Sequence, residues 1–299
     1  MLNLDRPRNA SGRVQISSTC VHGDLLVVGG FWGELVAKRL TEPDVAYATC
    51  ITHDDSAITN AVEVRCPLGF NSRQQGVRYR SITNEACGGG EQIFEMPGGG
   101  STRVLTSSND SIARVFDATT FQCLQKQSFG WAVNYSSPSP DRKLLAVVGD
   151  HPDGLLADFN TGQVVASLKG HMDFSFAVAW HPNGFTFATG NQDATTRIWD
   201  LRFLASATAV LPGRIGAIRS LRFSPDGRLL AMAEPADFVH LFDVRGDFRR
   251  SQVIDIFGEV AGIAFSPDSE SFFVGTEDQV YGSLMVTLLS AFAPRPACS

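Results

Sequence analysis

The feature that most constrains this chain is a turn sequence that returns at a nearly fixed interval. A proline followed by aspartate or asparagine recurs at spacings of 42, 43 and 42 residues. The four copies that keep this spacing are Pro140-Asp141, Pro182-Asn183, Pro225-Asp226 and Pro267-Asp268. Short runs of aromatic and β-branched residues, which favour strands, lie on both sides of each turn. Strand-rich units at a period of roughly 40–45 residues predict an all-β repeat architecture.

The clearest unit runs from residue 170 to residue 200 and reads GHMDFSFAVAWHPNGFTFATGNQDATTRIWD. It has three apolar runs separated by turn residues, a Gly-His start and a Trp-Asp end. This framing resembles one blade of a WD-repeat β-propeller. The resemblance implies a hydrogen-bonded network of His171, Thr189, Asp193 and Trp199. A buried, fully satisfied network fixes one strand register, so we interpret these four residues as structural and not catalytic.

The resemblance to WD-repeat proteins covers residues 14–289 and predicts an all-β propeller with six recognisable four-stranded blades. A degenerate or missing seventh blade stays open. Residues 1–13 and 290–299 are expected to be tails, and neither reads as a strand that could complete the last blade. Residues 68–102 contain two Gly-Gly-Gly runs and no sustained alternation, which indicates a flexible insertion in the second unit. This insertion is either an interaction arm or a tolerated loop.

Several strings are more narrowly similar to an uncharacterised WD-repeat family of fungi and plants. They include HMDFSFAVAWHPNG, TGNQDATTRIWD, GAIRSLRFSPDG and AMAEPADFVHLFDV. Members of that family extend further at the N-terminus, which would supply a blade or a closing strand. The resemblance implies a fold and leaves function to be argued from a site.

Composition excludes several classes of function. The net charge of −6 gives no reason to expect a nucleic-acid partner. No apolar run is long enough for a membrane span, and the first residues do not form a secretory signal, so we expect a cytoplasmic or nuclear location. The six cysteines form no CxxC pair, and no phosphate loop or metal-ligand spacing is present. We therefore expect no metal and no cofactor.

The loops around the mouth of the central channel are the expected contact surface for other proteins. Trp131, Asp173, Phe174 and Arg214 are placed there by the repeat, and aromatic residues with arginine are typical of binding hot spots. Phe176 is expected beside them. The alternative is that Phe174 and Phe176 only begin a buried strand.

A more specific partner is suggested by the end of the clearest unit. Trp199-Asp200-Leu201-Arg202 resembles the motif with which WD-repeat proteins dock onto the adaptor of cullin-type ubiquitin ligases. The resemblance implies that Asp200 and Arg202 contact that adaptor. The alternative is a surface arginine that follows an ordinary blade.

Two other functions remain as alternatives. Phe248-Arg249-Arg250-Ser251 resembles the box of phosphoinositide-binding propellers, in which Arg249 and Arg250 would bind lipid phosphates; it also reads as a solvated basic turn. The second alternative is a propeller enzyme with an active site in the central channel. The acidic residues of the turns recur at the repeat period, however, so their role in forming turns explains them without catalysis. The sequence therefore predicts a non-catalytic scaffold or adaptor for protein–protein interaction.

Overall fold

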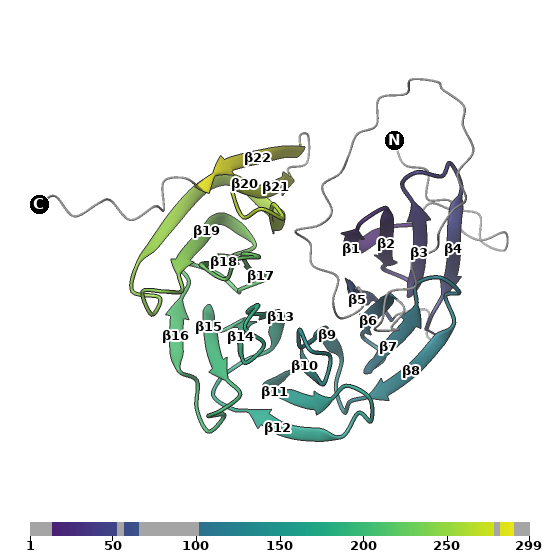
Figure 1. Ribbon diagram of the computed structural model, residues 1–299, viewed down its shortest axis with the longest axis horizontal. Coiled ribbons are helices and arrows are strands. Elements are labelled where there is room, and N and C mark those ends of the chain that lie inside the picture. The colour runs from purple at the N-terminus through teal and green to yellow at the C-terminus, as the bar shows by residue number, and fades with distance from the viewer. Residues whose placement is uncertain (1–13, 53–56, 66–101, 278–281, 290–299) are drawn as a thin grey trace, which may run out of the picture.

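Four repeat units form one antiparallel sheet each and the last two units share a sheet, and successive units are arranged around a common centre as in a β-propeller (Figure 1). The computed structural model describes residues 14–52, 57–65, 102–277 and 282–289. The predicted insertion at 68–102 lies outside these residues except for Thr102, and so do the predicted tails 1–13 and 290–299. No helix in the part of the chain that is described could cross a membrane.

Four units are four-stranded sheets in which each strand pairs with its neighbour in sequence. The first contains β1 (Ile16–His22), β2 (Leu25–Gly30), β3 (Glu34–Arg39) and β4 (Val45–Cys50). The second contains β5 (Thr59–Arg65), β6 (Arg103–Ser108), β7 (Ile112–Asp117) and β8 (Cys123–Ser128). The third contains β9 (Val133–Pro138), β10 (Leu144–Gly149), β11 (His151–Asp158) and β12 (Val164–Leu168). The fourth contains β13 (Ser175–Trp180), β14 (Thr186–Asn191), β15 (Thr195–Asp200) and β16 (Ala209–Pro212).

The remaining strands form one six-stranded sheet, which corrects the prediction of six separate four-stranded blades. It contains β17 (Ser220–Phe223), β18 (Leu229–Ala233), β19 (Ala236–Asp243), β20 (Ser251–Phe265), β21 (Ser271–Glu277) and β22 (Gly282–Leu288). β20 is 15 residues long and pairs first with β19 and then with β21. No proline or turn sequence interrupts it, so the outer strand of the fifth unit continues into the inner strand of the sixth. Gly258, with φ of 125°, lies where the pairing partner changes.

Apolar side chains pack between consecutive units and form the core. One cluster joins the first two units through Val27, Leu35, Val62 and Phe116. Equivalent clusters join each later unit to the next, and the last places Leu241 of the fifth unit with residues of the sixth. Each sheet is therefore stabilised mainly by its neighbours, as expected of a repeat protein.

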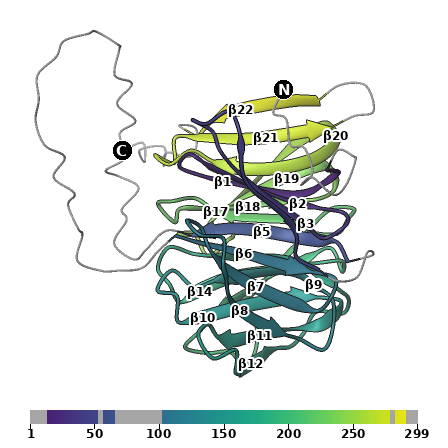
Figure 2. The same cartoon turned by 90° about the vertical axis from the view of Figure 1, so that its right-hand side faces the viewer.

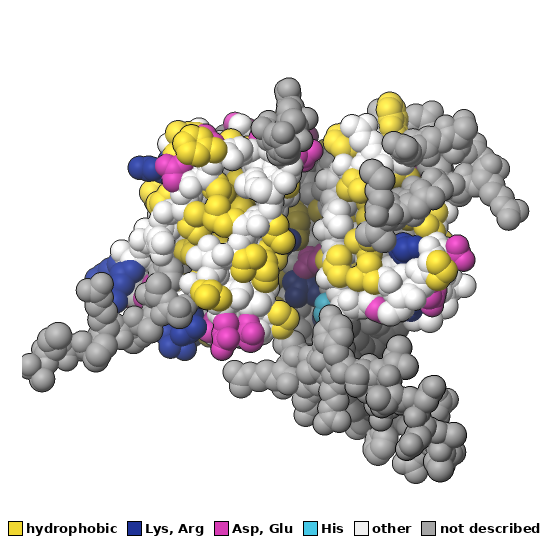
Figure 3. Space-filling view, turned by 90° about the horizontal axis from the view of Figure 1, so that it is seen from above, with side chains coloured by type: hydrophobic (Ala, Val, Ile, Leu, Met, Phe, Trp, Pro, Cys, Tyr) yellow, Lys and Arg dark blue, Asp and Glu magenta, His cyan; other side chains and the backbone are white. Residues whose placement is uncertain are grey.

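The described residues form an arc whose two ends are the first and the sixth units (Figure 1). Seen edge-on, the strands of successive units run across the thickness of this arc (Figure 2). The sixth unit has three strands, and within the described chain β22 pairs only with β21. Leu284, Val286 and Leu288 alternate along β22 and are exposed. Figure 3 looks onto this side and shows apolar side chains on both ends of the arc, with a cleft between them.

Candidate protein-interaction surface

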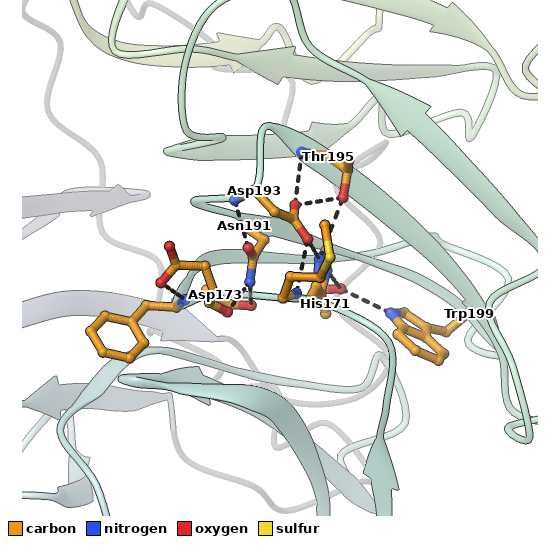
Figure 4. Close-up of polar contacts among 10 residues, drawn as sticks. His171, Asp173, Asn191, Asp193, Thr195 and Trp199 are labelled. Atoms are coloured by element: carbon orange, nitrogen blue, oxygen red, sulfur yellow. Dashed lines mark hydrogen bonds and ion pairs between the residues drawn. The ribbon is translucent and has the colours of Figure 1, made fainter.

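The fourth unit contains a buried chain of hydrogen bonds between side chains (Figure 4). The Trp199 indole N–H donates to the Thr189 hydroxyl at 2.9 Å, and Thr189 Oγ1 lies 2.9 Å from His171 Nε2. His171 Nδ1 lies 3.0 Å from a carboxylate oxygen of Asp193. The structure thus brings together the four residues that the sequence assigned to one network.

The protonation of His171 follows from its burial. Burial lowers the pKa of His171, although the hydrogen bond to Asp193 opposes the shift. A neutral imidazole with its proton on Nδ1 donates to Asp193 and accepts the Thr189 hydroxyl proton, so one ordering of protons satisfies the whole chain. His171, Thr189 and Trp199 are buried, and the Asp193 side chain is only 5% exposed. These groups hold the strand register and are closed to a substrate.

Asp193 also connects the network to the surface. Its carboxylate accepts the backbone N–H of Met172 at 3.1 Å and the hydroxyl of Thr195 at 2.6 Å. The loop that leads into β13 is therefore fixed by the buried network. A loop held in this way can present its side chains without a large entropy cost on binding.

Asn191, at the end of β14, holds two neighbouring loops together. Its side-chain amide donates to the carbonyl of Asp173 and, at 2.8 Å, to the hydroxyl of Ser175. The backbone carbonyl of Asn191 accepts the backbone N–H of Ile218 at 2.9 Å. The loops before β13 and β17 are therefore anchored on the same residue, although about forty residues separate them in the sequence.

Glu234 fixes the second of these loops and is a residue that the sequence analysis did not identify as positioning the site. Its buried carboxylate accepts the backbone N–H groups of Arg214, Ile215 and Gly216 at 2.6, 2.8 and 2.7 Å. His240 Nε2 lies 2.8 Å from the same carboxylate. Burial opposes ionisation, but these hydrogen bonds hold the pKa of Glu234 below its ordinary value. In the sequence, Glu234 is one of the turn acids that follow the repeat period, and that pattern does not indicate its role in this loop.

We call residues 129–132, 170–174 and 213–219 the loop rim, because these three loops precede the inner strands β9, β13 and β17. Three apolar side chains of the loop rim are exposed: Met172 by 83%, Phe174 by 43% and Ile215 by 68%.

Charged residues of the loop rim lie beside these apolar side chains. The Arg214 guanidinium lies 4.8 Å from the centre of the Phe238 ring. Asp173 is also exposed. Of the predicted contact residues, the rim therefore presents Asp173, Phe174 and Arg214 together.

Two further aromatic residues of this region are less accessible. Trp131, also a predicted contact, is half-buried, with its ring 6.0 Å from that of Phe129 and 6.2 Å from that of His151. Phe176 is half-buried, and the Arg219 guanidinium lies 3.7 Å from its ring centre. Both side chains therefore pack against neighbouring residues and add little exposed area to the surface.

Asp200 and Arg202 lie at the opposite edge, because β15 runs away from the rim. Arg202 Nε and Nη2 donate to the two carboxylate oxygens of Asp200 at 2.9 and 2.6 Å. The guanidinium also lies 4.5 Å from the centre of the Phe185 ring. The Arg202 side chain is nevertheless 71% exposed. It is therefore held in one direction while remaining available to a partner.

Arg249 and Arg250 are exposed in the turn between β19 and β20, on the same edge as Arg202. The structure places them apart from the loop rim.

Two family models match the chain. One, described as a WD domain, G-beta repeat, matches residues 162–200, and the other, described as an uncharacterised protein domain (DUF2415), matches residues 216–255. The first match coincides with the unit that contains the His171 network. The second covers most of the fifth unit.

Similar proteins include the uncharacterised protein C4G3.03 of Schizosaccharomyces pombe, 26% identical over 59% of this chain and 57% of its own length. A guanine nucleotide-binding protein subunit beta of Oryza sativa subsp. indica is 28% identical over 48% of this chain and 29% of its own. The target of rapamycin complex subunit wat1 of Schizosaccharomyces pombe is 32% identical over 34% of this chain and 33% of its own. The chain thus spans less than two thirds of the length of each relative.

Proposed function

The chain is a WD-repeat β-propeller protein, and on that premise we propose that it is a non-catalytic platform whose loop rim binds other proteins. The observation that carries this proposal is that exposed apolar side chains lie on loops whose backbone is held by buried groups. Met172, Phe174 and Ile215 are exposed on loops that are themselves held by buried groups. A rigid surface with exposed apolar side chains beside arginine has the composition of a binding hot spot.

The similar proteins give independent support. The rice protein is a subunit of a guanine nucleotide-binding protein, and wat1 is a subunit of the target of rapamycin complex. Both names describe proteins that work within assemblies. Because this chain shares the repeat fold of these proteins, a role within a protein assembly is the first one to test for it.

Replacing Phe174 and Ile215 together by serine is expected to reduce the recovery of bound proteins at least tenfold. Loss of hot-spot side chains costs about 2 kcal/mol or more each, because the pocket that receives them is left unfilled. The measurement is quantitative mass spectrometry of material purified with the tagged protein. The control replaces Val164 and Val165, which are exposed on β12 away from the rim. Equal recovery of bound proteins with the rim variant and with the wild type would contradict a role of the loop rim in binding.

A finer form of the proposal makes the chain a substrate receptor of a cullin-type ubiquitin ligase. Its support is the geometry of Arg202, whose guanidinium is oriented by Asp200 and Phe185 yet remains exposed. An oriented guanidinium can form charge-assisted hydrogen bonds across an interface. This role would use the edge opposite the rim and leave the rim free for a substrate.

Arg202→Ala is expected to abolish co-purification of the ligase adaptor without a change in thermal stability. The matched control is Arg245→Ala. Arg245 follows Phe242-Asp243 in the fifth unit as Arg202 follows Trp199-Asp200, and its backbone N–H donates to Asp243 at 3.1 Å. Adaptor recovery that is the same with Arg202→Ala and Arg245→Ala would contradict the finer proposal.

A further inference from the structure

The inner strands of five units line a partly open cavity of about 250 Å³ near the centre of the arc. β1, β5, β9, β13 and β17 each contribute lining residues. Polar and charged side chains line one part: Cys20, Glu63, Arg65, Tyr135, Ser137 and Arg222. Apolar side chains of β5, β13 and β17 line the rest. Charged side chains are visible within the cleft between the two ends of the arc (Figure 3).

Glu63 and Arg65 neutralise one another within this cavity. They form an ion pair, and the Ser137 hydroxyl donates to Glu63 at 3.1 Å while Arg65 Nη2 donates to Ser137 Oγ at 3.3 Å. Two buried atoms of the pair, Glu63 Oε2 and Arg65 Nε, have no hydrogen-bond partner. A buried acceptor and a buried donor without partners carry an energetic cost that a polar ligand can remove.

Arg222 supplies a positive charge that the pair does not neutralise. Its Nη1 donates to the Leu221 carbonyl at 2.8 Å and lies 3.4 Å from the Tyr135 hydroxyl, both of which are neutral. The second contact runs from β17 to β9 with β13 between them, so the guanidinium extends across the cavity. Within the described ranges, no carboxylate lies at ion-pair distance from Arg222. Glu63 attracts the guanidinium from beyond ion-pair distance, but Arg65 already neutralises that carboxylate. The cavity therefore keeps one net positive charge, which favours binding of an anion.

The other titratable groups of the cavity add no negative charge. Burial raises the pKa of Tyr135, although Arg222 opposes the shift. Burial also raises the pKa of the Cys20 thiol. Both groups are protonated at neutral pH and can act as donors. The thiol is therefore a poor nucleophile, which favours binding over covalent catalysis at this site.

We propose that the central cavity binds a small carboxylate or phosphate anion, with Arg222 and the Tyr135 hydroxyl as its principal donors. A hydroxyl or amino group of the same ligand would donate to Glu63 Oε2. Arginine suits this role because its planar fork of N–H donors matches both kinds of oxyanion. The cavity is smaller than the roughly 300–1,000 Å³ of sites for drug-sized ligands, which limits the ligand to the size of a small metabolite.

Isothermal titration calorimetry at constant ionic strength tests this site with inorganic phosphate in one arm and malonate in the other. We expect saturable binding of at least one probe to the wild type, and the arm that binds identifies the anion class. Arg222→Gln is expected to weaken that binding at least tenfold. Tyr135→Phe keeps every charge and removes one donor, so it is expected to weaken binding severalfold.

Arg245→Gln, an exposed arginine outside the cavity, is the control and should bind as the wild type does. Circular dichroism checks that each variant is folded. If Arg222→Gln does not fold, the comparison of Tyr135→Phe with the wild type decides the test. Absence of saturable binding in both arms would overturn the proposal. So would equal affinity of the wild type and the folded cavity variants.

Discussion

Trp199→Ala is expected to lower the free energy of unfolding by about 3–5 kcal/mol. The Trp199 side chain is fully buried and packs with Phe187, whose ring centre lies 6.4 Å away. Its removal leaves a cavity between the third and fourth units and takes away the donor to Thr189. Denaturant unfolding followed by circular dichroism measures the change.

Two matched variants separate packing from hydrogen bonding at this position. Trp199→Phe retains much of the aromatic ring but loses the indole N–H. It should therefore lower the free energy of unfolding by about 1 kcal/mol more than the loss of side-chain volume alone would. Trp32→Ala removes an exposed tryptophan and should change stability by no more than about 0.5 kcal/mol. A Trp199→Ala variant no less stable than Trp32→Ala would show that the network does not hold the fourth unit together.

Glu234→Ala is expected to destabilise the protein by about 3–5 kcal/mol, because it removes a buried charge that serves four donors. Three of these donors are consecutive backbone N–H groups of the loop rim, and the fourth is His240. We also expect hydrogen exchange at residues 214–216 to accelerate in this variant. Glu270→Ala, which removes an exposed carboxylate, is the control and should leave both measurements near those of the wild type.

Glu234 also gives the stability of the protein a defined dependence on pH. Because its pKa in the folded protein lies below the ordinary value of 4.5, its stabilising contribution is fully present above pH 4.5. The contribution falls as the pH decreases through the folded pKa. Glu234→Gln should therefore flatten the loss of stability in this acidic range. An acid dependence identical to that of the wild type would contradict this role.

The repeat allowed much of the fold to be predicted, because turn residues and strand patterns are local in sequence. The Pro-Asp turns fixed the period, and the Gly-His and Trp-Asp frame marked the unit that contains His171 and Trp199. The prediction of six separate blades required a break between two strands in the segment that forms β20. It could not show that the segment around Gly258 continues as one strand, because pairing with β19 and β21 decides this and no turn residue marks it.

The site was harder to predict because its residues meet through the stacking of units. Exposed Phe174 and Arg214 could be expected from their places in the repeat. Glu234 could not, because its role depends on a loop some twenty residues away folding back over it. The cavity depends on side chains of five inner strands, and alternation does not indicate that Arg222 reaches Tyr135 across the centre.

The central claim, that the loop rim binds partner proteins, is tested most directly by site-specific photo-crosslinking in cells. A photoreactive residue is placed at Ile215 in the rim or at Val165 on β12, both of which are exposed. The proposal predicts discrete crosslinked partners from position 215 and background labelling from position 165. Partners that crosslink only from position 165 would contradict it and place the binding surface on the outer strands.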